Sequence, residues 1–271
     1  MKKILVVLML LTCTLFLASC GQTKEGLIKE GYLKVATSPD YAPYEFLDLS
    51  KTGNDKFVGS DIELMKYIAE KLNLELVIVE MQFDAALAAV QTGKVDIAIE
   101  GLSWTPKRAQ TFELSNGYFG SGDGDQQLLI LKDNQSKFVD LASLNKSNVK
   151  VAAQAGTIQE EYVDTQLPNA RKELVTDLDI AVSLLLTKKI DALAISSYSA
   201  EVRVSKNDKL AVVAENFVSN DSGYVIAAKK GNKLLIDQIN TVLEDVVKQN
   251  LYSKWLEEAT LKAIELGQDI E

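Results

Sequence analysis

Histidine is absent from this sequence, and cysteine and proline are scarce, with two and four residues. The two cysteines, Cys13 and Cys20, both stand near the N-terminus. The remainder of the chain therefore has no thiol for a disulfide, a thiolate metal site or a nucleophile, and no imidazole for a catalytic triad. These absences argue against hydrolytic and redox chemistry, and we expect neither a metal nor a cofactor.

Basic residues are also in the minority. The chain has 29 Lys and Arg against 38 Asp and Glu, a formal net charge of -9. Nucleic acids bind proteins largely through positive charge, so a nucleic-acid partner is not expected. An acidic surface tolerates a cationic ligand, but it does not predict one, since it also serves solubility.

The N-terminal segment has the pattern of an export signal. Lys2 and Lys3 precede an apolar run over residues 4–16, and small residues follow it. The order Leu-Ala-Ser-Cys at 17–20 resembles the bacterial lipobox, which implies cleavage before Cys20, lipidation of its thiol and anchoring at the extracytoplasmic face of the membrane, the periplasmic side in a Gram-negative cell. The alternative is a secreted protein with a coincidental cysteine. We predict a signal peptide over 1–19 and a lipidated tether over 20–26.

Strand-like apolar runs alternate with helical patterns along the first part of the chain. Strands are predicted over 34–37, 74–79 and 95–99. A helix is expected to begin at Ser60, where Ser60 and Glu63 have the spacing of a capping box, and another to span 83–92 before Gly93. This order is typical of a parallel α/β sheet with right-handed crossovers.

The alternation restarts after a glycine-rich segment at 120–125, which we interpret as a crossover or hinge. The run 189–195 echoes 94–99 in sequence, which favours two lobes of like architecture. The last segments are too short for a third core. In this second half we expect strands over 127–131, 149–153, 190–195 and 225–228 and helices over 177–187, 233–248 and 251–258.

The segment from Glu100 to Arg108 joins a predicted buried strand to a helix N-terminus. Thr105 suits the N-cap and Pro106 the first helical position, so backbone N–H groups are expected to point outward beyond the strand. An anion is favoured there. Since the helix dipole disfavours a cation in this first turn, Arg108 is expected to meet something negative, and the alternative is a solvated surface arginine.

Glu100 is the unusual residue of this segment. A carboxylate at the end of a buried strand is costly unless it is paired. Three interpretations stay open from the residues: a receptor for a cation, a catalytic acid, or a structural partner of Arg108. Catalysis is the least favoured, because no second acid at a defined spacing accompanies it.

The loop after the strand 34–37 is expected to emerge at the same edge of the sheet as residues 100–103, where ligands collect in α/β folds. The loop 38–44 contains two prolines and Tyr41, and Phe83 opens a helix after a strand, so either ring is a candidate ligand wall or a core residue. Thr157 and Glu160 have capping-box spacing after Gly156, which marks another helix N-terminus.

From Tyr32 to Glu258 the chain resembles the extracytoplasmic solute-binding proteins of ABC transporters for polar amino acids. The resemblance implies the α/β, two-lobed type II periplasmic-binding-protein fold, each lobe a mainly parallel sheet flanked by helices, with the ligand in the interlobe cleft. It implies lobe 1 over 27–121 and 222–271 and lobe 2 over 122–221. The segments that carry it are 40–46, 59–64, 83–87, 101–108 and 156–160.

The resemblance also implies roles for individual residues. Arg108 would bind the α-carboxylate of an amino acid with the backbone at Ser103, Thr157 and Ile158. The groups at Gly101 and Ser103 would serve the α-ammonium, and the rings of Tyr41 and Phe83 would flank the side chain. The implied partners are an amino acid, an ABC permease with its ATPase, and the membrane through the lipid anchor, with the protein a monomer.

The chain departs from the family pattern at three positions. Ser196 stands where the family usually has an aspartate for the α-ammonium, Glu100 where it has a small residue, and Ser38 where some binders of basic amino acids have an acid. We hypothesise that Glu100 supplies the missing negative charge, to the α-ammonium or to a cationic side chain. The prediction is a binding protein rather than an enzyme; the alternatives are a dehydratase-like lyase on the same fold and a surface adhesin or sensor lipoprotein.

Overall fold

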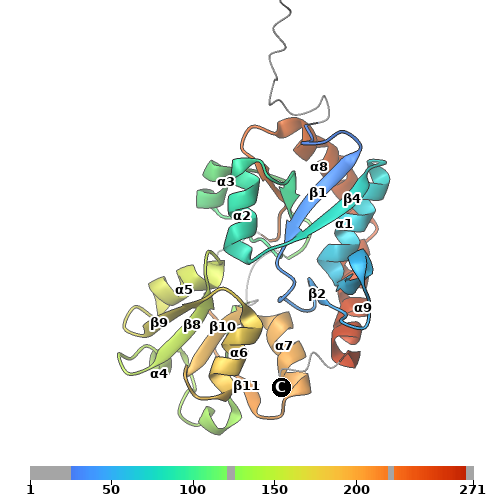
Figure 1. Cartoon of the computed structure of the whole chain (residues 1–271). Coiled ribbons are helices and arrows are strands. Elements are labelled where there is room, and N and C mark those ends of the chain that lie inside the picture. Colours follow the sequence, from blue (N-terminus) through green and yellow to red (C-terminus); the bar gives the residue numbers. More distant parts are fainter. Residues whose placement is uncertain (1–25, 121–125, 219–222, 267–271) are drawn as a thin grey trace, which may run out of the picture.

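The computed structural model describes residues 26–120, 126–218 and 223–266. Over these ranges the chain forms two lobes, each built on a five-stranded sheet with helices packed against it (Figure 1). The expected signal peptide, the lipidation site at Cys20, nearly all of the tether and most of the glycine-rich crossover lie outside the described residues. Within the described ranges no helix is both long and apolar enough to cross a membrane.

The first sheet has the strand order β4-β1-β5-β12-β6. β1 pairs in parallel with β4 and β5, whereas β12, which follows the second lobe in the chain, is antiparallel to both its neighbours. A two-stranded sheet of β2 and β3 lies in the same lobe. The strands are β1 Tyr32–Thr37, β2 Phe46–Leu47, β3 Phe57–Val58, β4 Glu75–Glu80, β5 Ile97–Ala98, β6 Phe112–Leu114 and β12 Ala227–Lys229.

The second sheet repeats this arrangement in the order β11-β7-β10-β8-β9. β8 pairs in parallel with β9 and β10, and β7, the strand by which the chain enters this lobe, is antiparallel to its neighbours. Two mainly parallel sheets of like topology are thus confirmed. The strands are β7 Gln126–Leu131, β8 Lys150–Gln154, β9 Arg171–Val175, β10 Ala192–Ser196 and β11 Leu210–Val212.

Helices cover the sheets, and two of them, over 83–92 and 233–248, have the predicted bounds. β9 and α7 were not predicted from the sequence. In lobe 1 the helices are α1 Ser60–Lys71, α2 Phe83–Thr92, α3 Pro106–Thr111, α8 Lys233–Lys248, α9 Leu251–Glu265 and the 3₁₀ turn Gly53–Lys56. In lobe 2 they are α4 Leu141–Leu144, α5 Ile158–Gln166, α6 Leu178–Leu186, α7 Ser197–Lys206 and the 3₁₀ turn Lys132–Asn134.

The start of α1 differs from the predicted capping box. The N-cap is Gly59, with φ 129° and ψ 166°, a conformation that only glycine adopts readily. A Cβ at Gly59 would lie 2.1 Å from the carbonyl oxygen of Tyr44. Only a glycine therefore lets these two backbone segments lie so close together at the start of the helix. The Ser60 hydroxyl instead donates to the Tyr252 hydroxyl at 3.0 Å and ties α1 to α9.

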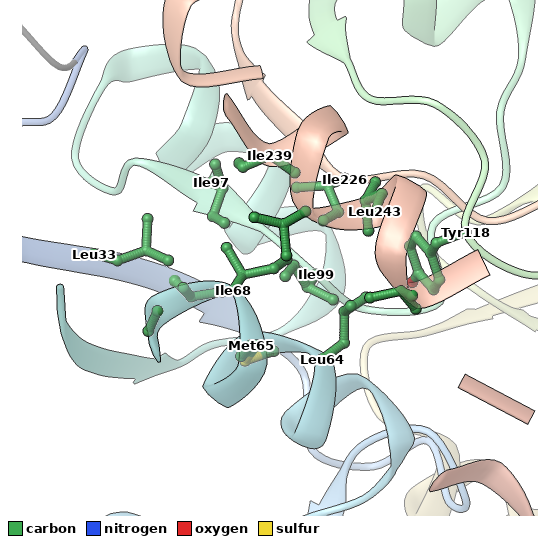
Figure 2. Close-up of a cluster of buried hydrophobic side chains, with 14 of the residues drawn as sticks. Leu33, Leu64, Met65, Ile68, Ile97, Ile99, Tyr118, Ile226, Ile239 and Leu243 are labelled. Atoms are coloured by element: carbon green, nitrogen blue, oxygen red, sulfur yellow. The ribbon is translucent and has the colours of Figure 1, made fainter. Parts of the chain in front are cut away.

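Each lobe has its own hydrophobic core. In lobe 1 the apolar faces of α1 and α8 meet the sheet, as Figure 2 shows for Leu33, Ile68, Ile97 and Leu243. Lobe 2 buries apolar side chains on both faces of its sheet. The ring of Tyr41 packs against clusters of both lobes, which places the loop after β1 at the junction between them.

Candidate functional site

A narrow cavity lies between the lobes, beyond the carboxyl ends of strands from both sheets, with about 20 Å³ open to the centre of a water molecule. Every sequence-predicted ligand residue except Glu100 and Ser196 lines it. The lining residues are Ser38, Asp40, Tyr41, Glu45, Phe83, Gly101, Ser103 and Arg108 from lobe 1, and Gln154, Thr157, Ile158, Gln159, Leu178, Ala194 and Ile195 from lobe 2.

Arg108 places a buried guanidinium at the cavity wall. As predicted, Pro106 opens α3 and the Thr105 side chain caps it, accepting from the Arg108 N–H at 3.1 Å. The guanidinium donates through Nη1 to the Ser103 carbonyl at 2.6 Å and through Nη2 to the Gly156 carbonyl at 3.0 Å. Because these carbonyls belong to different lobes, Arg108 joins them and presents a fixed positive charge to the cleft.

The loop at Gly101 is shaped by its lack of a side chain. Gly101 has φ 58°, and a Cβ there would lie 2.7 Å from the ring of Tyr41. Its N–H donates to Asp61 Oδ2 at 2.7 Å, which anchors the loop to α1. The absence of a side chain therefore lets the Tyr41 ring lie directly on the loop and form one wall of the cavity. Burial of its hydroxyl raises the pKa of Tyr41 to about 12.

The opposite wall begins at the turn into α5. The Thr157 side chain accepts from the Glu160 N–H at 3.3 Å, which confirms Thr157 as the N-cap. The Glu160 carboxylate accepts from the N–H of Gly156 rather than from that of Thr157, at 2.8 Å, and also pairs with Lys172 at 3.1 Å. Contacts within lobe 2 therefore hold the turn in place, and its Gly156 carbonyl accepts the hydrogen bond from Arg108.

The structure adds two acids to the site that the sequence analysis did not assign, Asp40 and Glu45. Both lie in the loop segment that carries the family resemblance, but only proximity in three dimensions shows that they reach the cavity. Burial raises the pKa of Asp40 to about 6. Burial, and then the neighbouring Asp61 carboxyl, raise the pKa of Glu45 well above its ordinary value.

Glu100 and Ser196 are placed differently from the expectation of direct ligand contact. Both are fully buried and neither lines the cavity. Ser196 ends β10 and caps α7, accepting from the Ser199 N–H at 3.3 Å. The carboxylate oxygens of Glu100 have no hydrogen-bond partner among the described residues. Direct ligand contact by these two residues therefore stays a prediction that the cavity lining does not support.

Burial raises the pKa of Glu100 well above its ordinary value, and the nearby Arg108 charge opposes this only in part. The folded protein therefore holds the proton more tightly than the unfolded chain, and stability falls as pH rises from the ordinary carboxyl pKa toward the raised one. Glu100→Gln removes this loss, so we expect the stability of the variant relative to the wild type to grow with pH, by up to about 1.4 kcal/mol per pH unit in that window.

Urea unfolding of both proteins at pH 5 and pH 8 measures this difference, and calorimetry with L-arginine measures binding. A neutral Glu100 behind the wall predicts arginine affinities within about threefold at pH 7, which corresponds to less than about 1 kcal/mol. If Glu100→Gln loses arginine binding and its stability relative to the wild type does not change with pH, then Glu100 is ionised and acts as the counter-charge of the ligand.

A model of the bacterial extracellular solute-binding proteins, family 3, matches residues 33–258. The chain belongs to this family. Its members are extracellular, which supports a place outside the cytoplasm for this protein as well.

Similar proteins and structures agree with this assignment. The chain is 28% identical over 269 residues to a probable histidine-binding protein of Campylobacter jejuni, covering 97% of this chain and all of that one. A Streptococcus pneumoniae amino acid ABC transporter substrate-binding protein, solved with L-arginine, superposes with a TM-score of 0.78 at 35% identity, covering 85% and 94% of the two chains. Cyclohexadienyl dehydratase of Pseudomonas aeruginosa is 23% identical over 256 residues, 91% of this chain and 92% of that one.

Proposed function

We propose that this protein captures a cationic L-amino acid, with arginine the first candidate, by closing its two lobes around it. It then delivers the ligand to the permease and ATPase of an ABC importer. We retain the lipid anchor at Cys20 as part of the proposal, since it would hold the receptor beside its permease. The protein is proposed to act as a monomer.

The charge pattern of the cavity is the observation that carries this proposal. Arg108 provides one fixed positive charge, which suits an α-carboxylate bound by charge-assisted hydrogen bonds. Of the two carboxyl groups in the lining, Asp40 already accepts hydrogen bonds from both lobes, whereas no described residue donates a hydrogen bond to the Glu45 carboxyl. A cationic group of the ligand beside Glu45 would pair with it and favour its ionised form.

The aromatic lining supports a flat cation in particular. The Phe83 ring lies 5.8 Å from the Arg108 guanidinium, and the Tyr41 ring forms the wall beside Gly101. Aromatic faces attract guanidinium groups, so the same rings are suited to a ligand guanidinium. The structural neighbour solved with L-arginine gives independent support for this choice of ligand.

We further infer that binding is not followed by a reaction. Glu100, the acid that the sequence offered for a lyase, does not line the cavity; Asp40 and Glu45 do, so the inference rests on the relatives and not on a lack of acids. The probable histidine-binding relative and the arginine-bound neighbour support a binding protein over a lyase or an adhesin.

A melting-temperature screen of the purified protein against the common amino acids tests the proposed ligand. Ligand at 100 times its Kd stabilises the native state by about 2.7 kcal/mol, which is a shift of roughly 5 to 10 °C for a chain of this size. Arginine is expected to give the largest shift, followed by other basic amino acids. Shifts confined to neutral or acidic amino acids would contradict the cationic assignment, and turnover of a prephenate-like acid without any such shift would favour the lyase.

A further inference from the structure

We propose that Asp40 is a clasp between the lobes, which stabilises the closed form by capping helix α6 of the opposite lobe. Asp40 stands in the loop after β1, in lobe 1. Its carboxylate oxygen Oδ2 accepts from the Leu178 N–H at 2.8 Å and from Gln154 Nε2 at 2.8 Å, both in lobe 2. The Ser38 hydroxyl holds the other oxygen, Oδ1, at 2.7 Å.

The N-terminus of α6 shows why this contact belongs to closure. A helix leaves its first N–H groups without partners inside the helix. Asp177, the N-cap, accepts from the N–H groups of Asp179 at 2.8 Å and Ile180 at 2.9 Å. The first helical N–H, that of Leu178, is satisfied from lobe 1 by Asp40. Opening the lobes therefore returns this N–H to water, and closing them completes the cap.

A second set of bonds holds the same loop. Arg203 of α7 is buried, and its Nη2 donates to the Asp40 carbonyl at 2.9 Å and to Asp179 Oδ1 at 3.0 Å. The loop around Asp40 is thus bound at both its backbone and its side chain by three elements of lobe 2. All of these hydrogen bonds are formed between protein groups of the two lobes.

The same geometry separates the clasp from a role in ligand recognition. Asp40 lines the cavity, but Oδ2 already accepts two hydrogen bonds from lobe 2 and Oδ1 accepts one from Ser38. A counter-ion for a ligand cation would act only on cationic ligands. A clasp acts on every ligand that requires closure, because it shifts the equilibrium between open and closed forms.

Amide hydrogen exchange in the ligand-free protein tests the clasp directly. In Asp40→Ala the Leu178 amide is expected to exchange at least threefold faster than in the wild type. The Ile180 amide, capped by Asp177 within its own lobe, serves as the internal control and should be unchanged. Equal exchange of Leu178 in the two proteins would overturn the proposal. Asp40→Asn, which keeps the volume and one acceptor oxygen, should fall between them and guards against a misfolded alanine variant.

A second arm rests on the proposed function, since it requires amino acid binding. Asp40→Ala is expected to weaken the binding of L-arginine and of L-glutamine by the same factor, about 3- to 30-fold, through faster dissociation. Asp55 is an exposed acid of the same lobe, and Asp55→Ala is expected to leave both affinities unchanged. Loss confined to arginine would overturn the clasp in favour of a counter-ion. If no amino acid binds the wild type, the proposed function fails while the exchange result still decides the clasp.

Discussion

Arg108→Ala is expected to weaken binding of L-arginine by roughly 30- to 5,000-fold, the equivalent of about 2 to 5 kcal/mol. The guanidinium is buried at the cavity wall, and the Ser103 and Gly156 carbonyls fix its position. Removing it leaves the ligand carboxylate desolvated opposite an uncharged wall and also removes one bridge between the lobes. Calorimetric titration of the variant measures the loss.

Two variants control this prediction. Lys107→Ala removes the neighbouring exposed cation of α3 and is expected to change affinity by less than about threefold, because an exposed charge is screened by water and salt. Arg108→Lys keeps a charge but not the planar fork that reaches two carbonyls, so it should recover only part of the binding. An affinity of Arg108→Ala close to that of Lys107→Ala would remove Arg108 from the site.

The parts of the site that local sequence determines were predictable. The strand before Glu100, the Thr105 cap and the proline at the first helical position together locate Arg108, because each depends on near neighbours in the chain. Thr157 was predictable for the same reason. Sequence also indicated the repeated lobe architecture, since alternating strands and helices carry their own periodicity.

The parts that depend on contacts between distant residues were not predictable in this way. The bond from Leu178 to Asp40 joins residues 138 positions apart, and that from Gln154 to Asp40 spans 114. Glu100 is a second example, because the sequence marked it as unusual but could not show whether its side chain reaches the cavity. In the structure Glu100 is buried and does not line the cavity.

Buried acids behind the cavity link the site to the rest of lobe 1. Asp61, at the start of α1, accepts from the Gly101 N–H at 2.7 Å, from the Tyr252 hydroxyl at 2.6 Å and from the Tyr118 hydroxyl at 3.0 Å. One carboxylate thus joins the binding loop, the segment after β6 and the C-terminal helix α9. Burial raises the pKa of Asp61, while these hydrogen bonds act to lower it.

Asp61→Ala is therefore expected to cost about 3 to 5 kcal/mol of stability, because each buried donor left without its acceptor costs about 1 to 3 kcal/mol. This corresponds to a melting temperature lower by roughly 6 to 20 °C. Glu63→Ala is the matched control on the same helix, since the Glu63 side chain is 42% exposed and forms a surface ion pair with Lys66; it should melt within about 2 °C of the wild type.

Asp61→Asn separates the hydrogen bonds from the charge. Its amide oxygen can still accept from the Gly101 N–H, and its NH₂ group can donate to the phenol oxygens of Tyr118 and Tyr252, so the loss should be less than half that of alanine. Neutralising Asp61 also removes the charge that helps to raise the pKa of Glu45. Glu45 would then ionise more readily beside a cationic ligand, so Asp61→Asn should retain arginine binding although it melts earlier. If Asp61→Ala melts at the same temperature as Glu63→Ala, the hydrogen bonds to Asp61 do not stabilise the fold.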